Sequence, residues 1–204
     1  MLQRLANTRL VRAYASALEA RPLTTKLTSS GTLMAASDVL RQWLEQREQL
    51  KGAAGAGSSN GGPAFSWDAQ RTCRQTSFAV IVHAPFIHMY HPLIERLFAP
   101  VAHVRGVTIA KVFFDQTLVA PPFLSGFLIY MTLAEGRTLA DGCRRVEQQL
   151  EPLMRTSWMV WGLAHCVTFN LPVPIRLLWQ DSVRLYFGTV MSLRSNQAIR
   201  PAES

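Results

Sequence analysis

The residue types best suited to chemistry are two histidines and an acid near the middle of the chain. His88, His91 and Glu95 lie at i, i+3 and i+7, which would place them on one helical face. Imidazole and carboxylate groups are zinc ligands. Pro92 interrupts this face, however, and no second pair of ligands is visible in the sequence. We therefore favour polar packing or pore lining for these side chains and expect no metal.

The sequence carries no recognisable catalytic motif. It has no GxSxG, HExxH, GxGxxG or P-loop pattern, and its Ser, His and Asp residues form no evident nucleophile–base set. The three cysteines, Cys73, Cys143 and Cys166, are far apart and form no CxxC, which indicates neither a disulfide framework nor a zinc knuckle. We therefore expect no enzyme and no cofactor.

Polar side chains inside apolar runs are more informative. Such residues are costly in lipid, so they face a bundle interior or a wet cavity. They either line a polar path for solutes or form hydrogen bonds between helices, and the second role is favoured for any single residue. Because every expected span carries at least one, the set as a whole favours a hydrated interior. The candidates for pore lining or interhelical contacts are Asp38, Arg41, His88, Asp115, Gln116, Asn170 and Arg176, with His83 and His165 in the same polar set.

Long uncharged runs predict the elements that position these residues. Residues 156–175 form a run of 20 residues without a formal charge, which spans about 30 Å as a helix, the thickness of a bilayer core. We expect four transmembrane helices near 24–46, 74–97, 111–134 and 156–175. An amphipathic interfacial helix is expected at 136–155 and a further helix at 175–193. The predicted fold class is all-α: a polytopic membrane helical bundle with about four transmembrane helices plus amphipathic interfacial helices.

Several local features of these spans make separate predictions. Gly31 and Ala35 form a small-xxx-small pair that lets a neighbouring helix approach closely, and Asp38 and Arg41 pair at i, i+3. Pro121-Pro122 should bend or break the third span. Asp115 needs a cation or water, and its candidate partners are Lys111 on its own helix or, from other helices, Arg41, Arg71 and Arg176.

Composition agrees with a membrane protein. Charged residues make up 17% of the 204 residues, against about 25% in an average soluble domain, and the mean hydropathy is +0.10. The net charge of +8 does not indicate a nucleic-acid partner, because no Lys/Arg cluster interleaved with aromatics is present. The arginines mainly flank apolar runs, as suits anionic lipid headgroups, so the expected partner is a lipid bilayer.

The chain divides into a basic N-terminal segment, a helical domain and a short tail. Residues 1–21 hold four arginines and one acid, which resembles a mitochondrial targeting segment; the alternative is a surface helix lying on the membrane. Residues 22–193 form the expected transmembrane domain, with a flexible Gly/Ala/Ser loop at 51–66. Residues 194–204 form the C-terminal tail.

Six sequence blocks together carry a resemblance to a known family. They are Tyr14-x3-Leu18-x3-Pro22-x2-Thr25-Lys26 running on to Asp38 and Gln42; Asp68-x2-Arg71-Thr72-x-Arg74; Pro85-x2-His88-x-Tyr90; Lys111-x3-Asp115-Gln116-x4-Pro121; Trp158-x2-Trp161 with Phe169-Asn170 and Val173-Pro174-x-Arg176; and Met191-Ser192. In this order the blocks resemble the Mpv-seventeen/peroxisomal membrane protein family, over nearly everything from Tyr14 to Ser192. Departures from the usual pattern are Ser37, Ala84, Gly162, His165 and Phe187.

The resemblance implies four transmembrane helices and a non-selective channel for small solutes or metabolites, in a family linked to mitochondrial DNA maintenance and reactive-oxygen handling. No catalytic residues carry over. The expected function is a multi-pass channel of the mitochondrial inner membrane that contributes to mitochondrial homeostasis. The alternatives are a channel of the same family in the peroxisomal membrane and a membrane scaffold that conducts nothing. Assembly into a homo-oligomer is a further possibility.

Overall fold

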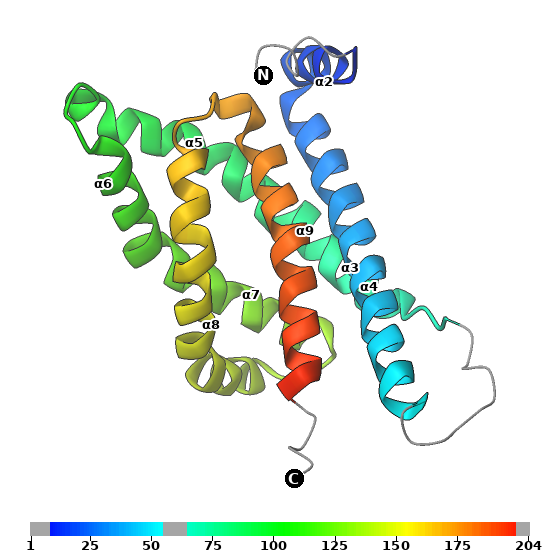
Figure 1. Cartoon of the computed structure of the whole chain (residues 1–204). Helices are drawn as coiled ribbons and strands as arrows, with labels where there is room; N and C mark the ends of the chain where they lie inside the picture. The colour runs from blue at the N-terminus through cyan, green and yellow to red at the C-terminus, as the bar shows by residue number, and fades with distance from the viewer. Residues whose placement is uncertain (1–8, 55–64, 199–204) are drawn as a thin grey trace.

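The computed structural model describes residues 9–54 and 65–198, and these residues form helices, turns and short connections without a strand (Figure 1). The expected all-α fold is confirmed. The helices are α2 (Arg9–Ala20), α3 (Pro22–Ala54), α4 (Ala69–Phe78), α5 (Ala84–Phe98), α6 (Val107–Phe114), α7 (Ala120–Ala134), α8 (Leu139–Thr168) and α9 (Val173–Ala198), with π-helical segments η1 (Ala79–His83) and η3 (Asp115–Val119) and the 3₁₀ turn η2 (Ala99–Val101).

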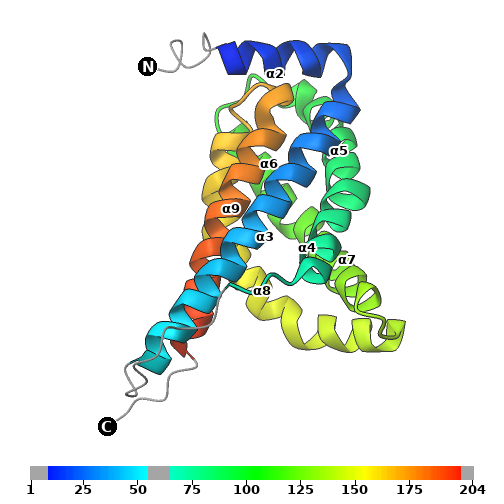
Figure 2. The same cartoon turned by 90° about the vertical axis from the view of Figure 1, so that its right-hand side faces the viewer.

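The long helices run lengthwise beside one another and turn back at the two ends of the bundle (Figures 1 and 2). α3 packs most extensively along α9, and α7 along α8. α2 lies across one end, which we call the α2 end; the α5–α6 and α8–α9 turns lie there too (Figure 2). At the other end, the α4 end, α4 begins, α7 stops and the first half of α8 lies crosswise (Figure 2).

Each π-helical segment ends two residues before a proline. A proline has no N–H to donate, and its ring crowds the carbonyl four residues earlier. η3 ends where the N–H of Ala120 donates to the carbonyl of Asp115, and Pro121-Pro122 then open α7. η1 likewise precedes Pro85. The predicted bend at Pro121-Pro122 is visible between α6 and α7, although the helix widens rather than breaks (Figure 1).

The close approach predicted at Gly31 is confirmed. A Cβ atom added to Gly31 would lie 2.9 Å from Cγ2 of Val80, so α3 and η1 touch where the glycine lacks a side chain. The predicted i, i+3 pair is present as well, with Nη2 of Arg41 3.3 Å from Oδ1 of Asp38.

Side chains are distributed opposite to those of a soluble protein. More polar and charged than hydrophobic side chains are buried among the described residues, including Asp38 and His91, which are 0% exposed. Large apolar side chains meanwhile cover the outside on most of the long helices. Among the most exposed are Ile81, Met89, Leu93, Ile109, Phe113, Leu118, Met159 and Leu163. An apolar exterior around a polar interior is typical of helices packed in lipid.

By length and composition, two continuous helices among the described residues could cross a membrane. They cover Ala69–Val101 and Val107–Ala134, and so contain the predicted spans 74–97 and 111–134. The predicted span 24–46 lies within α3.

The boundaries of the fourth predicted span are wrong. Residues 156–175 are not one helix, because α8 ends at Thr168 and the chain turns before α9 starts at Val173. Pro172 and Pro174 prevent continuation, since proline disfavours helical geometry in the residue before it. The predicted interfacial helix at 136–155 is the first half of the same α8, which bends near Pro152 (Figure 2).

Three predictions concern segments that lie partly outside the described ranges. They are the targeting role of the first residues, the loop at 51–66 and the tail at 194–204. Of these segments the structure describes residues 9–21, of which 9–20 form α2, the end of α3 up to Ala54, residues 65 and 66, and the end of α9.

Candidate functional site

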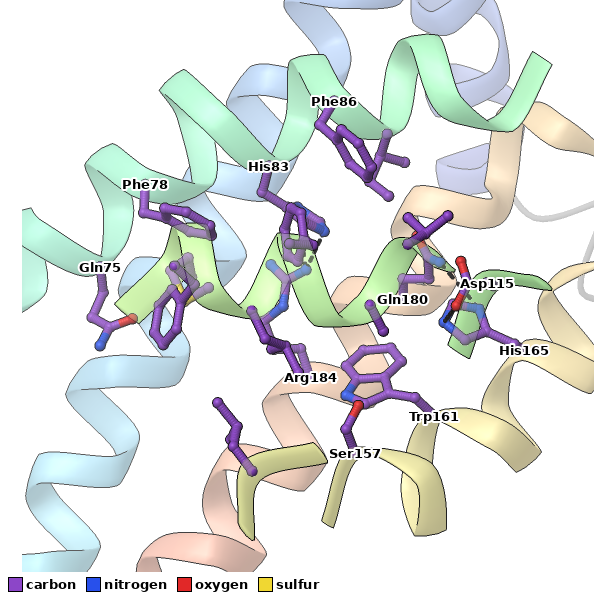
Figure 3. Close-up of a pocket in the computed structure, with 18 of the residues that line it drawn as sticks. Gln75, Phe78, His83, Phe86, Asp115, Ser157, Trp161, His165, Gln180 and Arg184 are labelled. Carbon is purple, nitrogen blue, oxygen red and sulfur yellow. Dashed lines mark hydrogen bonds and ion pairs between the residues drawn. The ribbon is translucent and has the colours of Figure 1, made fainter. Parts of the chain in front are cut away.

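A cavity of about 530 Å³ lies inside the bundle (Figure 3). Its apolar wall comes from Phe78, Phe86, Phe123 and Phe127, whose rings pack across α4, α5 and α7 with centroids 5.0–5.8 Å apart. Most of its polar lining comes from η1, η3, α8 and α9: His83, Asp115, Gln116, Ser157, His165, Gln180 and Arg184. A pocket of this size with convergent polar groups is a default candidate for a binding site.

Asp115 is the centre of the first polar cluster in the cavity. The hydroxyl of Tyr90 donates to Oδ1 at 2.6 Å, and Nε2 of Gln116 donates to Oδ2 at 2.7 Å. Nε2 of His165 lies 3.3 Å from Oδ2, and Nε2 of Gln180 lies 3.5 Å from Nδ1 of the same ring. If the amide of Gln180 donates to Nδ1, the imidazole carries its proton on Nε2, facing the carboxylate. Three other segments thus converge on η3.

A second polar cluster faces the same cavity from α9. The guanidinium of Arg184 contacts both ring nitrogens of His83, with 3.2 Å to Nδ1. Its Nη1 lies 3.2 Å from Oδ1 of Asp181, which also accepts a hydrogen bond of 3.4 Å from Ser30. Figure 3 shows His83 and Arg184 pointing toward each other across the cavity. This cluster joins η1, α3 and α9.

Asp38 organises a third cluster between α3 and α4. Its side chain is 0% exposed and accepts from Thr72 Oγ1 at 2.7 Å and from Gln42 Nε2 at 2.8 Å. Nε of Arg71 lies 3.1 Å from Oδ1, and Arg71 also forms a bidentate pair with Glu45. Full satisfaction of a buried carboxylate in this way fixes one helix against the other.

Glu95 organises a fourth cluster near the α2 end. Nζ of Lys111 and Nη1 of Arg176 each lie 2.7 Å from one of its oxygens. Arg176 also donates to the carbonyls of Phe169 and Leu171, and so holds the α8–α9 turn. On the neighbouring α3, Nζ of Lys26 lies 3.1 Å from Nδ1 of His88 on α5.

The structure brings some of the predicted site residues together and separates others. Asp115, Gln116 and Arg41 line the cavity. Asp38, His88 and Arg176 instead form contacts between helices, outside its lining. Asn170 is exposed and donates to the carbonyl of Cys166 within its own helical turn.

The partners predicted for Asp115 are wrong. Lys111 and Arg176 bind Glu95, while Arg41 and Arg71 bind Asp38. The prediction assumed that a buried carboxylate requires a cation or water. Hydrogen bonds to the charged form also stabilise it, and the hydroxyl, amide and imidazole groups around Asp115 supply them.

Four residues that line the polar part of the cavity or contact its lining were not proposed from the sequence. These are Tyr90, Gln180, Asp181 and Arg184. One signal was available: Arg176, Gln180 and Arg184 recur every four residues, which places three polar side chains on one face of α9.

No cluster of three His, Cys, Asp or Glu side chains suited to a metal occurs within residues 9–54 and 65–198. The triad considered from the sequence is separated by its contacts. His88 faces Lys26, Glu95 binds two cations, and His91 is buried with neither ring nitrogen hydrogen-bonded.

These features define a class of protein: a helical membrane bundle whose polar side chains face inward. A model of the Mpv17 / PMP22 family matches residues 132–192, from the end of α7 into α9. Peroxisomal membrane protein 2 of Bos taurus is 26% identical over 180 residues, which cover 88% of this chain and 86% of the relative. Protein SYM1 of Saccharomyces cerevisiae is 25% identical, over 94% of this chain and 92% of the relative.

The mitochondrial inner membrane protein Mpv17 of Caenorhabditis briggsae is 22% identical, over 91% of this chain and 93% of the relative. None of these three relatives is named as an enzyme. No solved structure matches the chain. Along most of its length the chain is similar to membrane proteins of the Mpv17 / PMP22 family, in agreement with the resemblance seen in its sequence blocks.

Proposed function

We propose that this protein is a multi-pass channel of the mitochondrial inner membrane that passes small solutes or metabolites through its interior and contributes to mitochondrial homeostasis. The observation that carries the proposal is the cavity of about 530 Å³ with ionisable and amide side chains on one wall. Such groups are costly inside a membrane protein, and they mark solute and ion paths by default. The names of relatives support both a mitochondrial and a peroxisomal membrane, and the peroxisome is the alternative location.

The crossings of the membrane form part of this proposal. The four spans expected from the sequence are supplied by α3, by the continuous helix from α4 to α5, by the continuous helix from α6 to α7 and by the second half of α8. We add α9 as a crossing, because it runs back along α3 for the length of the bundle (Figure 1). Its charged side chains Arg176 and Asp181 are each 4% exposed and so face protein rather than lipid.

The Glu95 cluster is the proposed closed end of the path. Lys111, Glu95 and Arg176 tie α6, α5 and α9 together between the cavity and the α2 end. An apolar cluster that includes Ile94 and Leu177 packs beside it. Opening this end requires those ion pairs to separate, which makes the cluster a candidate gate.

Conductance of the purified protein in planar bilayers tests the proposal. Channel activity is expected from the wild-type protein, and Asp115→Asn should alter the conductance, its ion selectivity or its pH dependence more than it alters thermal unfolding. Glu151→Gln is the control, because Glu151 is 74% exposed and forms an ion pair with the equally exposed Arg155. If bilayers that contain folded wild-type protein show no conductance, the scaffold alternative is favoured.

A separate experiment addresses location. Import of the full chain into isolated mitochondria and peroxisomes, with and without residues 1–21, separates the two membranes. Import into mitochondria that depends on residues 1–21 is expected. Insertion into peroxisomes alone would assign the alternative.

A further inference from the structure

A second pocket, of about 560 Å³, lies at the α4 end among α4, α7 and the first half of α8. We call it the arginine pocket. Three arginines line it, Arg71, Arg74 and Arg145, and the one acid in its lining is Glu135. Its remaining wall is largely apolar, from Phe127, Leu128, Met131, Pro152 and Leu153. The arginine pocket therefore combines a basic region with an apolar wall.

Arg74 has no ion pair or side-chain hydrogen bond within the described residues. Its Nε atom is buried and has no hydrogen-bond partner. A guanidinium carries five N–H donors in a fixed fork, and a buried donor without an acceptor is costly. The other two arginines differ from it, since Arg71 is held by Glu45 and Asp38.

Arg145 is held only loosely. Its Nη1 lies 3.3 Å from both Thr132 Oγ1 and Glu135 Oε1, and its Nε lies 3.3 Å from Oε1 of Gln149, all long for hydrogen bonds from a guanidinium. Arg145 and Glu135 are both partly exposed. Arg145 can therefore turn toward an anion in the pocket without breaking a strong contact.

We propose that the arginine pocket binds a phosphate group, with Arg74 and Arg145 as its ligands and the apolar wall against the organic part of the molecule. Paired guanidinium groups match phosphate oxygens geometrically, and basic pockets between transmembrane helices hold anionic headgroups. The phosphate comes either from an anionic phospholipid or from a soluble organic phosphate. This site does not depend on the proposed conductance.

The pocket also adjoins the cavity. Gln75, Phe127 and Leu153 line both hollows, so these three side chains form the boundary between them. A phosphate held by Arg74 lies one residue from Gln75 along α4. Occupancy of the arginine pocket is therefore positioned to affect the α4 end of the cavity.

The test is binding to the full chain, measured without any conductance assay. In one arm, the protein is placed in nanodiscs of phosphatidylcholine with or without phosphatidylglycerol, and the lipids that remain bound are weighed by native mass spectrometry. In the other arm, glycerol 3-phosphate is titrated into protein in neutral detergent. We expect bound phosphatidylglycerol, and about a tenfold weaker retention in Arg74→Gln and in Arg145→Gln.

Arg155→Gln is the matched control, since it removes a 74%-exposed arginine from the same helix as Arg145. Arg74→Lys should recover part of the binding, and thermal unfolding without ligand checks that each variant folds. Binding of glycerol 3-phosphate alone, lost in the same two variants, supports the site and assigns a soluble source. Equal binding by wild type, Arg74→Gln and Arg145→Gln in both arms overturns the proposal, as does loss of binding in Arg155→Gln to the same extent.

Discussion

At the scale of single residues, this protein stabilises buried charge in two ways. Asp115 is surrounded by the hydroxyl of Tyr90, the amide of Gln116 and the ring of His165, whereas Asp38 and Glu95 each contact two cations. A carboxylate held by polar groups beside a cavity keeps oxygens that a solute can reach. A carboxylate enclosed by two arginines is better suited to holding helices together. This difference is why we propose Asp115 for conductance and Asp38 for stability.

Asp38→Asn should strongly destabilise the protein. The substitution removes the partner of Arg41 and places amide hydrogens where Thr72 and Gln42 now donate. Breaking a buried pair by removing one partner costs about 3–5 kcal/mol. The measurement is thermal or denaturant unfolding in detergent, with Glu151→Gln as the control, because its exposed pair contributes at most about 1 kcal/mol. Equal unfolding midpoints for the two variants would contradict this prediction.

At the scale of elements, the two π-helical segments place the polar residues of the cavity. His83 closes η1, and Asp115 and Gln116 open η3, while a proline follows each segment. A π turn inserts one extra residue into a helix and so rotates the side chains beyond it. The prolines that interrupt the apolar runs therefore also set where the polar groups point.

Gly31→Val should weaken the packing of α3 against η1. The added side chain would begin 2.9 Å from the Val80 methyl group, and overpacking of this kind costs about 1–3 kcal/mol. Gly126→Val is the matched control, because a Cβ atom at Gly126 meets nothing within 4 Å. The free energy of unfolding of each variant in detergent checks the prediction, which fails if the two substitutions cost the same.

The start of α8 should respond to acid. Arg144, which donates to Asp141 at 2.6 Å, and the hydroxyl of Thr138 lower the pKa of Asp141, which completes a capping box. A lowered pKa means that this stabilisation is present above the unfolded pKa of about 3.9 and is lost as pH falls toward the folded value. We expect the protection of the amides in residues 139–143, measured against the intrinsic exchange rate at each pH, to fall below about pH 4. Asp141→Asn should remove most of this dependence; an unchanged pH profile in that variant would refute the cap as its cause.

At the scale of the whole molecule, the apolar exterior and the polar interior both suit a helical bundle in a membrane. Met89 and Leu163, which are 73% and 75% exposed, are suited to contact with lipid. The buried polar clusters join α3, α5, α8 and α9. Lipid gives no hydrophobic drive for helices to associate, so polar contacts of this kind supply part of it.

The two ends of the chain should lie on opposite sides of the membrane. α2 lies at one end of the bundle and α9 finishes at the other, so the crossings that we propose place the termini apart (Figure 1). Tags at each terminus, tested by protease protection in sealed organelles or proteoliposomes, measure this arrangement. Protection of both tags from the same side would instead favour the four spans predicted from the sequence, without α9 as a crossing.

The sequence by itself predicted the all-α fold, the two apolar helices long enough to cross a membrane and the family resemblance, because apolar runs and family blocks are local properties of the chain. It also predicted the close approach at Gly31, which depends only on the missing side chain of that residue. It predicted the Asp38–Arg41 pair too, because the two residues lie within one helical turn. The partners of Asp115 and the polar face of α9 depended on the tertiary structure. Asp115 meets Tyr90 25 residues away, and Ser30 meets Asp181 151 residues away. Such long-range contacts are decided by how whole helices pack against one another. The sequence alone offers several possible cationic partners for each acidic residue and does not choose between them.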